Sequence, residues 1–103
     1  MDTEQNTITT ISYTTVEQFI ENFEQKRKEI KHTLTLEEGT VKSNSLHFKL
    51  EQVDDISFKN FSTGGGHLYL HTDQGVFSFI VSIDPTYFIH SFRKIKWKNH
   101  YIW

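Results

Sequence analysis

The sequence predicts a single α+β domain, in which an antiparallel bent sheet or partly open barrel of about five to six strands packs against an N-terminal and a C-terminal helix. The length of 103 residues is typical of one domain. Apolar residues recur at helical spacing near both ends of the chain, over residues 15–30 and 84–96. Between these segments, from Lys31 onward, apolar and polar residues alternate with the period of two that characterises strands.

The N-terminal part of the chain predicts a short strand followed by an amphipathic helix. Thr7–Tyr13 is rich in β-branched residues, which favour strands, and residues 1–6 are expected to be flexible. Thr15, followed three positions later by Gln18, matches a capping box at the start of a helix. The helix is expected over residues 15–30 because its apolar side chains share one face; they are Val16, Phe19, Ile20 and Phe23.

The middle of the chain predicts a succession of strands joined by turns. Apolar residues occupy alternate positions in four segments: Leu34 and Leu36; Leu46, Phe48 and Leu50; Ile56 and Phe58; Leu68 and Leu70. Turns are expected at Glu37–Thr40 and at Asp73–Gly75, where a glycine follows polar residues. Val76–Ile83 is apolar on both faces in its second half, as expected for a strand at the centre of a sheet.

The C-terminal segment predicts a second helix. Asp84 is a favourable N-cap, and Pro85 fits the first helical position. The apolar residues that follow have the spacing of one helix face; they are Phe88, Ile89, Phe92 and Ile95. Basic residues near the end of this helix are placed favourably beside the negative end of its dipole.

The composition excludes several classes of protein. The chain has no cysteine, which rules out disulfides and thiolate metal sites. The first ten residues show no secretory signal, and no apolar run approaches the roughly 20 residues of a membrane span, so a soluble, cytoplasmic protein is expected. The net charge of −2 divides into 11 acidic and 6 basic residues over 1–55, against 2 acidic and 5 basic residues over 56–103. These bases are too few for a strong nucleic-acid footprint.

The run from Leu34 to Lys96 resembles the bacterial pleckstrin-homology-like (PH-like) domains. A pattern of apolar positions carries the resemblance: "LEQVDDISFKNF" looks like the polar lead-in to a strand of that family, and "DPTYFIHSF" looks like its C-terminal helix. The resemblance implies a PH-like fold and a scaffold that mostly binds proteins and seldom catalyses a reaction. Lipid-binding members hold phosphorylated headgroups with basic residues in the first hairpin loops. Here that stretch carries Glu37, Glu38 and only Lys42, so headgroup binding is not carried over.

Three consecutive glycines, Gly64, Gly65 and Gly66, stand between two predicted strands and suggest a phosphate-binding loop. A P-loop needs the pattern G-x-x-x-x-G-K-[ST] between a strand and a helix, whereas this stretch has no lysine and runs into a strand. Glycine adopts positive φ at little steric cost, so a hairpin turn is the favoured interpretation. The alternative is an exposed recognition loop that includes His67 and Tyr69.

Six histidines raise the question of a metal site. His67 and His71 lie roughly 13 Å apart along one face of a predicted strand, so they need a partner such as His47 to share one ion. Surface or half-buried histidines are the favoured interpretation, a zinc site is the alternative, and histidines sharing one face would respond to pH near about 6–7. Adjacent carboxylates point to opposite sides of a strand or face water, and no G-x-S-x-G elbow is present. No catalytic, metal-binding or cofactor-binding residue is therefore assigned.

The end of the second helix and the tail over residues 97–103 interleave basic and aromatic side chains: Arg93, Lys94, Lys96, Trp97, Lys98, Tyr101 and Trp103. Three interpretations are open. Trp97 and Ile102 could fold back onto the body while the lysines cap the helix. The tail could instead contact a protein partner, or it could bind single-stranded nucleic acid or an anionic membrane surface.

The predicted function is that of a small, non-enzymatic, cytosolic protein-binding domain of an adaptor, regulatory or immunity type, which acts by occupying a protein partner. Its expected contact residues are the glycine hairpin with His67 and Tyr69, and the aromatic and basic residues of the tail. The alternative is a peripheral binder of anionic membrane or nucleic acid through the tail, whose binding salt would weaken. A homodimer is compatible with the sequence, and no cofactor is expected.

Overall fold

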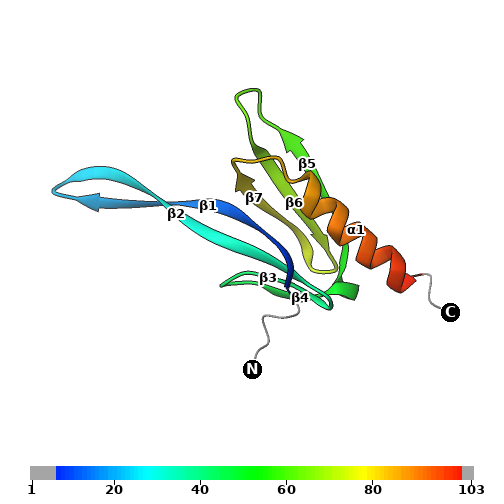
Figure 1. Cartoon of the computed structure of the whole chain (residues 1–103). Helices are drawn as coiled ribbons and strands as arrows, with labels where there is room; N and C mark the ends of the chain where they lie inside the picture. The colour runs from blue at the N-terminus through cyan, green and yellow to red at the C-terminus, as the bar shows by residue number, and fades with distance from the viewer. Residues whose placement is uncertain (1–6, 101–103) are drawn as a thin grey trace.

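The computed structural model describes the backbone of residues 7–100 and the side chains of residues 7–97. Within them, seven antiparallel strands form one open sheet, and an α-helix follows the last strand (Figure 1). The order across the sheet is β4-β3-β2-β1-β7-β6-β5. The elements are β1 (Thr7–Glu21), β2 (Glu24–Glu37), β3 (Thr40–Lys42), β4 (His47–Lys49), the 3₁₀ helix η2 (Leu50–Gln52), β5 (Val53–Asn60), β6 (Gly66–Thr72), β7 (Gly75–Val81) and α1 (Thr86–His100).

The predicted PH-like α+β fold, with five to six strands and an N-terminal helix, is wrong. Residues 15–30 form the ends of β1 and β2 and the turn between them, and the two strands pair continuously from Thr9↔Leu36 to Glu21↔Glu24. This pairing gives each strand residue of the segment a cross-strand neighbour, and such long-range contacts override a local helical periodicity. The expected flexible segment, residues 1–6, lies outside the described residues.

The sheet curves strongly around the buried core. Three strands separate β4 from β7 in the sheet order, yet the ring centroids of Phe48 and Phe77 lie 5.2 Å apart. The core residues come from both halves of the sheet and from α1; they are Ile11, Tyr13, Leu34, Leu36, Val41, Phe48, Leu50, Val53, Ile56, Leu68, Leu70, Phe79, Val81, Phe88, Ile89 and Phe92. The predicted alternation is confirmed for the strand residues Leu34, Leu36, Phe48, Ile56, Leu68 and Leu70, which face inward. Phe58 is only partly buried, Leu46 lies outside the strands, and Leu50 belongs to η2.

The predicted C-terminal helix is confirmed. Phe88 and Phe92 are buried against the sheet, and Ile95 packs on the same cluster. The carboxylate of Asp84 accepts a hydrogen bond from the backbone N–H of Thr86 at 2.9 Å, which fits its predicted role at the start of the helix.

The expectation that β7 is apolar and buried on both faces is only half correct. β7 does lie inside the sheet, between β1 and β6. Phe79 and Val81 face the core, but Val76 and Ile80 on the opposite face are 60% and 42% exposed. The sheet therefore has one covered face and one open face at β7.

A long hairpin extends away from the rest of the sheet (Figure 1). β1 bridges β7 only at Thr14↔Ile80, and β2 pairs with β3 only at Thr35 and Leu36. Beyond these contacts the two strands continue as a two-stranded arm, which we define as residues 15–30. Its length contributes to molecular dimensions of 61 × 38 × 24 Å. No member of the buried core comes from the arm.

Candidate functional site

The glycine run forms the turn between β5 and β6, as predicted. Gly64 and Gly65 have positive φ angles of 104° and 68°. A Cβ atom at Gly65 would overlap the carbonyl oxygen of Val81, and one at Gly66 would overlap that of Lys59. Gly65 and Gly66 are therefore required for the close approach of neighbouring strands, while Gly64 is exposed. Because these glycines serve the packing of the strands, any recognition by this hairpin would depend on the side chains that flank it.

The flanking side chains form a row along the open face of β6. The ring centroids are 4.9 Å apart for Phe61 and His67, 5.8 Å for His67 and Tyr69, and 6.5 Å for Tyr69 and His71. Val76 and Ile80 of β7 pair with His71 and His67 respectively. The structure thus brings His67 and Tyr69 onto one partly exposed surface, as the recognition-loop alternative requires.

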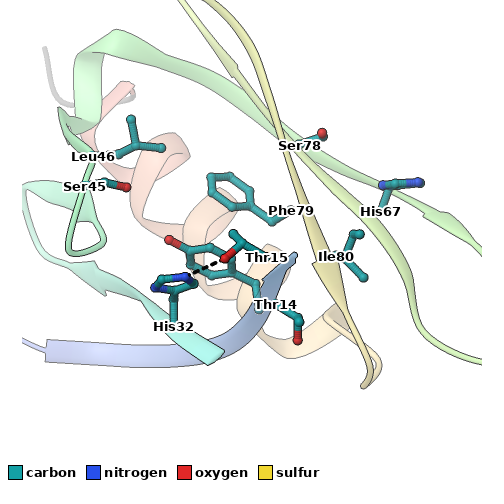
Figure 2. A pocket seen from close by; sticks show the side chains of 10 residues that line it. Thr14, Thr15, His32, Ser45, Leu46, His67, Ser78, Phe79 and Ile80 are labelled. Atoms are coloured by element: carbon teal, nitrogen blue, oxygen red, sulfur yellow. Dashed lines mark hydrogen bonds between the residues drawn. The ribbon is translucent and has the colours of Figure 1, made fainter. Parts of the chain in front are cut away.

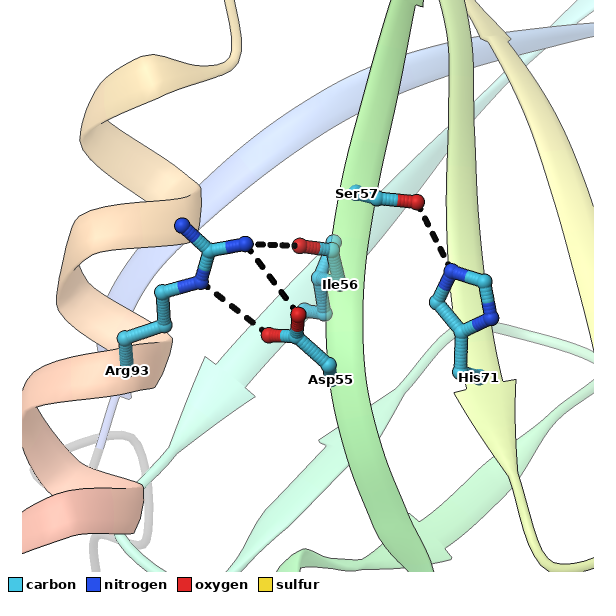
Figure 3. Close-up of polar contacts among 5 residues, drawn as sticks. All are labelled: Asp55, Ile56, Ser57, His71 and Arg93. Carbon is cyan, nitrogen blue, oxygen red and sulfur yellow. Dashed lines mark hydrogen bonds and ion pairs between the residues drawn. The ribbon is translucent and has the colours of Figure 1, made fainter.

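A serine and a histidine meet on the same face, but without the third member of a catalytic triad (Figure 3). Ser57 Oγ lies 2.7 Å from His71 Nε2. Both carboxylate oxygens of the neighbouring Asp55 accept hydrogen bonds from Arg93, at 3.0 and 3.1 Å, so this carboxylate is directed to α1. Because the base is not oriented by a carboxylate, the pair does not form the arrangement that activates a serine.

The histidines do not assemble into a metal site within the part of the chain that the structure describes. His67 and His71 share a face of β6, whereas His47 lies on β4 at the opposite edge of the sheet. No three histidine, aspartate or glutamate side chains among the described residues are grouped so that they could hold a metal ion. The three histidines therefore do not form a cluster, because four strands separate β4 from β6 in the sheet order.

The outward face of α1 carries a shallow groove of about 580 Å³. Its lining joins three predicted contact residues with three that the sequence analysis did not select; the six are Tyr87, His90, Ser91, Arg93, Lys94 and Trp97. Tyr87 is 71% exposed and Trp97 is 62% exposed. Trp97 therefore does not fold back onto the body, while Ile102, the other residue of that interpretation, lies outside the described residues.

Two of the predicted basic contact residues are used inside the molecule. Arg93 binds Asp55 and also donates to the carbonyl oxygen of Ile56 at 3.1 Å. Lys96 Nζ donates to the carbonyl oxygen of Leu50 at 3.0 Å. Lys94 is exposed, so it remains free to contact a ligand. The side chain of Lys98 and the whole of Tyr101 and Trp103 lie outside the described residues.

A hollow of about 330 Å³ lies at the base of the arm (Figure 2). The ring of His32 stacks on Tyr13 with a centroid distance of 5.0 Å, and Thr15 Oγ1 lies 2.9 Å from His32 Nε2. Tyr13 in turn contacts Phe79 edge to face at 4.8 Å. These contacts tie the first residues of the arm to the core, so the hollow belongs to the joint between arm and body.

The two most exposed large apolar side chains among the described residues, Phe23 and Ile20, lie on the arm. Val16 and Phe19 are 37% and 41% exposed, Ile20 is 76% exposed, and Phe23 is 102% exposed. Asn22 and Phe23 form the two-residue turn between β1 and β2, and both have positive φ angles, of 53° and 65°. We call Phe19, Ile20 and Phe23 the arm tip.

Sequence reasoning missed the arm tip because it assigned these residues to the buried face of a helix. The spacing of Val16, Phe19, Ile20 and Phe23 fits that helix, whereas a strand places Val16 and Ile20 on one face and Phe19 on the other. The β-branched and aromatic content of Thr14–Ile20 is the signal that favours a strand. The turn itself lacks the glycine that usually marks a two-residue hairpin.

A comparison with protein-family models and with curated proteins finds no match for this chain. The membership of the PH-like family therefore stays a prediction. Among the described residues, no helix combines the length and the apolar character that crossing a membrane requires.

Proposed function

We propose that the protein is a non-enzymatic protein-binding domain that contacts its partner through the arm tip. The observation that carries the proposal is Phe23, a large aromatic residue in a left-handed backbone conformation with its side chain wholly exposed. Positive φ is unfavourable for bulky residues, and strained residues of this kind cluster at functional positions.

Phenylalanine at this position does not contribute to the stability of the fold through burial. Two-residue hairpin turns with positive φ at both central residues favour Asn-Gly, and Asn22 already supplies the first of these. The Phe23 side chain buries nothing in its own chain, since it is 102% exposed. Its contribution is therefore expected outside the chain, and exposed aromatic side chains are common anchors of protein interfaces.

Neighbouring side chains extend the tip into a small apolar surface. Ile20 is two positions from the turn and 76% exposed, and Phe19 lies on the other face of the same strand. The arm holds both on a paired backbone, so little conformational freedom is lost on binding. A protruding hairpin with an apolar end fits a groove on a protein partner.

The test is affinity capture from a bacterial lysate with the wild-type protein and with Phe23→Gly. Because glycine suits the turn, Phe23→Gly should keep the fold and should not lower the free energy of unfolding. The affinity for a captured, purified partner should fall at least about tenfold, as for a truncated interface anchor.

The matched control is Tyr87→Ala, which removes an exposed aromatic side chain from α1 and should leave this affinity unchanged. Equal binding by the wild-type protein and Phe23→Gly would contradict the proposal. Binding to anionic lipid vesicles with no protein captured would also overturn it, in favour of a membrane-binding arm.

The nucleic-acid or membrane alternative through the tail has less support from the described residues. Arg93 and Lys96 make the intramolecular contacts given above, which leaves Lys94 as the exposed base beside Trp97. We retain the protein-binding function, together with the cytosolic location that the sequence predicts.

A further inference from the structure

The arm has two outer edges, one along each of its strands. β1 bridges β7 at Thr14 and turns at Asn22, so within the described residues 15–21 of β1 pair with a strand on one side only. β2 is in the same position along the arm, because β3 pairs only with Thr35 and Leu36. The unpaired backbone N–H and C=O groups of such an edge can pair with a further strand.

The two edges differ in charge. Six of the eight residues from Glu24 to Lys31 on β2 are charged, and four of these six are lysine or arginine. Basic side chains of this density are a known protection of an edge against pairing. The seven residues from Thr15 to Glu21 on β1 include only two charges and three large apolar side chains. The β1 edge is therefore the one open to a further strand.

We propose that a second copy of the chain occupies this edge, so that two arms pair β1 to β1 in antiparallel orientation. The seven unpaired residues are centred on Gln18, and an antiparallel pairing that uses all of them places a two-fold axis there. This two-fold arrangement is the closed, self-complementary form typical of homodimers. It joins the two arms into one four-stranded sheet.

The side chains of the β1 edge complement themselves in this register. Val16 lies opposite Ile20 of the second copy, and the symmetry repeats this apolar pair. Gln18 lies opposite Gln18 of the second copy. Glu17 faces Phe19 and Thr15 faces Glu21, so no two carboxylates oppose one another.

The neighbouring registers are disfavoured by charge. A shift of one residue would bring side chains of opposite faces level with one another. A shift of two residues places Glu17 opposite Glu21 of the second copy in one direction, and opposite Glu17 of the second copy in the other. Directly opposed like charges destabilise a strand pair. The register centred on Gln18 is therefore selected against its neighbours.

The dimer is expected to be weak and reversible, because a seven-residue edge buries less than the roughly 1,200 Å² of a standard interface. It rests on the same arm as the proposed function, and the β1 edge shares Phe19 and Ile20 with the arm tip. The two proposals are separated by variants at unshared residues, since Phe23→Gly alters no residue of the β1 edge and Gln18 is not part of the arm tip.

The substitution Gln18→Glu tests the register of the dimer without disturbing the pairing of β1 with β2 inside the arm. Within one chain Gln18 lies opposite Arg27, and its side-chain oxygen accepts a hydrogen bond from Gln25 Nε2 at 2.9 Å. A glutamate keeps the acceptor and gains an oppositely charged neighbour in Arg27. In the dimer, however, it places two carboxylates face to face on the two-fold axis.

Sedimentation equilibrium of the full chain, from micromolar to millimolar concentration, measures the effect. We expect a monomer–dimer equilibrium for the wild-type protein and about a tenfold weaker dimer for Gln18→Glu. Gln74→Glu makes the same charge change in the exposed β6–β7 turn and should dimerise like the wild-type protein. Phe23→Gly should also dimerise normally.

A charge exchange provides the second measurement. An equimolar mixture of Gln18→Glu and Gln18→Lys should form a heterodimer tighter than either variant's homodimer. The inference is overturned if the wild-type protein stays monomeric to millimolar concentration, if Gln18→Glu dimerises like the wild-type protein, or if Gln74→Glu weakens the dimer equally.

Discussion

At the scale of single residues, Gly66 is a position where crowding alone excludes a side chain, since its φ is not positive. Its backbone lies so close to β5 that a Cβ would overlap the carbonyl oxygen of Lys59 and crowd the Phe58 ring. Gly39, in the turn between β2 and β3, has open space around it and no positive φ. Substitution of Gly39 is therefore a control for substitution of Gly66. The comparison distinguishes crowding between β5 and β6 from the general effect of replacing a glycine.

We predict that Gly66→Ala lowers the free energy of unfolding by about 2–3 kcal/mol, because β5 and β6 must move apart. Gly39→Ala should change it by less than about 1 kcal/mol, since only the flexibility of the unfolded chain is affected. Urea denaturation followed by circular dichroism measures both. Equal losses in the two variants would show that crowding at β5 is unimportant.

Asp55 links α1 to the edge strand of the sheet through Arg93. Burial acts to raise the pKa of the Asp55 carboxyl, but the hydrogen bonds from Arg93, the backbone N–H of Ile56 and the nearby positive charge outweigh it. The net result is a pKa below the ordinary value of 3.8. A depressed pKa means that the ionised carboxylate stabilises the folded state above this value, and that the contribution disappears as the pH falls through the folded pKa.

Asp55→Asn should therefore destabilise the protein at pH 7 and have little effect at low pH. Both side chains are more than 40% exposed, so solvent screening limits the loss at neutral pH to about 1 kcal/mol. Urea midpoints at about pH 7 and about pH 2 measure the difference. The exposed neighbour provides the control Asp54→Asn, and a loss that is the same at both pH values would assign the effect to packing.

At the scale of elements, the arm is separable from the body. None of the core residues lies between Thr14 and Thr33, and Thr15 pairs directly with Ile30 across the hairpin. A short turn between these two residues would preserve the register of the remaining strands. The body of the domain therefore has a complete hydrophobic core without the arm.

Replacing residues 16–29 by Asn-Gly should leave the free energy of unfolding within about 1 kcal/mol of the wild-type value, because no buried apolar side chain is removed. The same variant should lose both self-association and capture of a partner. Chemical denaturation and sedimentation equilibrium report the two properties separately. Failure of the shortened chain to fold would show that the arm stabilises the body.

The elements that could be predicted from the sequence are those that bury one face, because burial gives their apolar residues a regular spacing. The alternation of Leu68 and Leu70 and the helical face of Phe88 and Phe92 both survive in the structure, since each follows from burial of one face. The arm could not be predicted from a buried stripe, because its apolar residues face solvent. Its one local signal is the β-branched and aromatic content of Thr14–Ile20, and the pairing of the two strands stabilises them further.

At the scale of the whole molecule, local patterns predict the placement of some candidate site residues, whereas long-range contacts determine the placement of others. The row around His67 and Tyr69 follows from strand alternation beside a glycine turn, and its placement on one face was predictable. The use of Arg93 by Asp55 joins residues 38 positions apart. Such a long-range pairing leaves no local signal in the sequence. The sequence therefore predicts Arg93 and Lys96 as free surface bases, although the fold uses both in intramolecular contacts.

The length of the arm also governs how the molecule moves through solution. The radius of gyration is 15.7 Å, compared with about 13 Å for a compact domain of this size. Friction therefore exceeds that of a sphere of equal mass, and end-over-end tumbling is slower than rotation about the long axis. A monomer will elute early from a gel-filtration column and could be taken for a dimer, whereas sedimentation equilibrium reports mass without regard to shape.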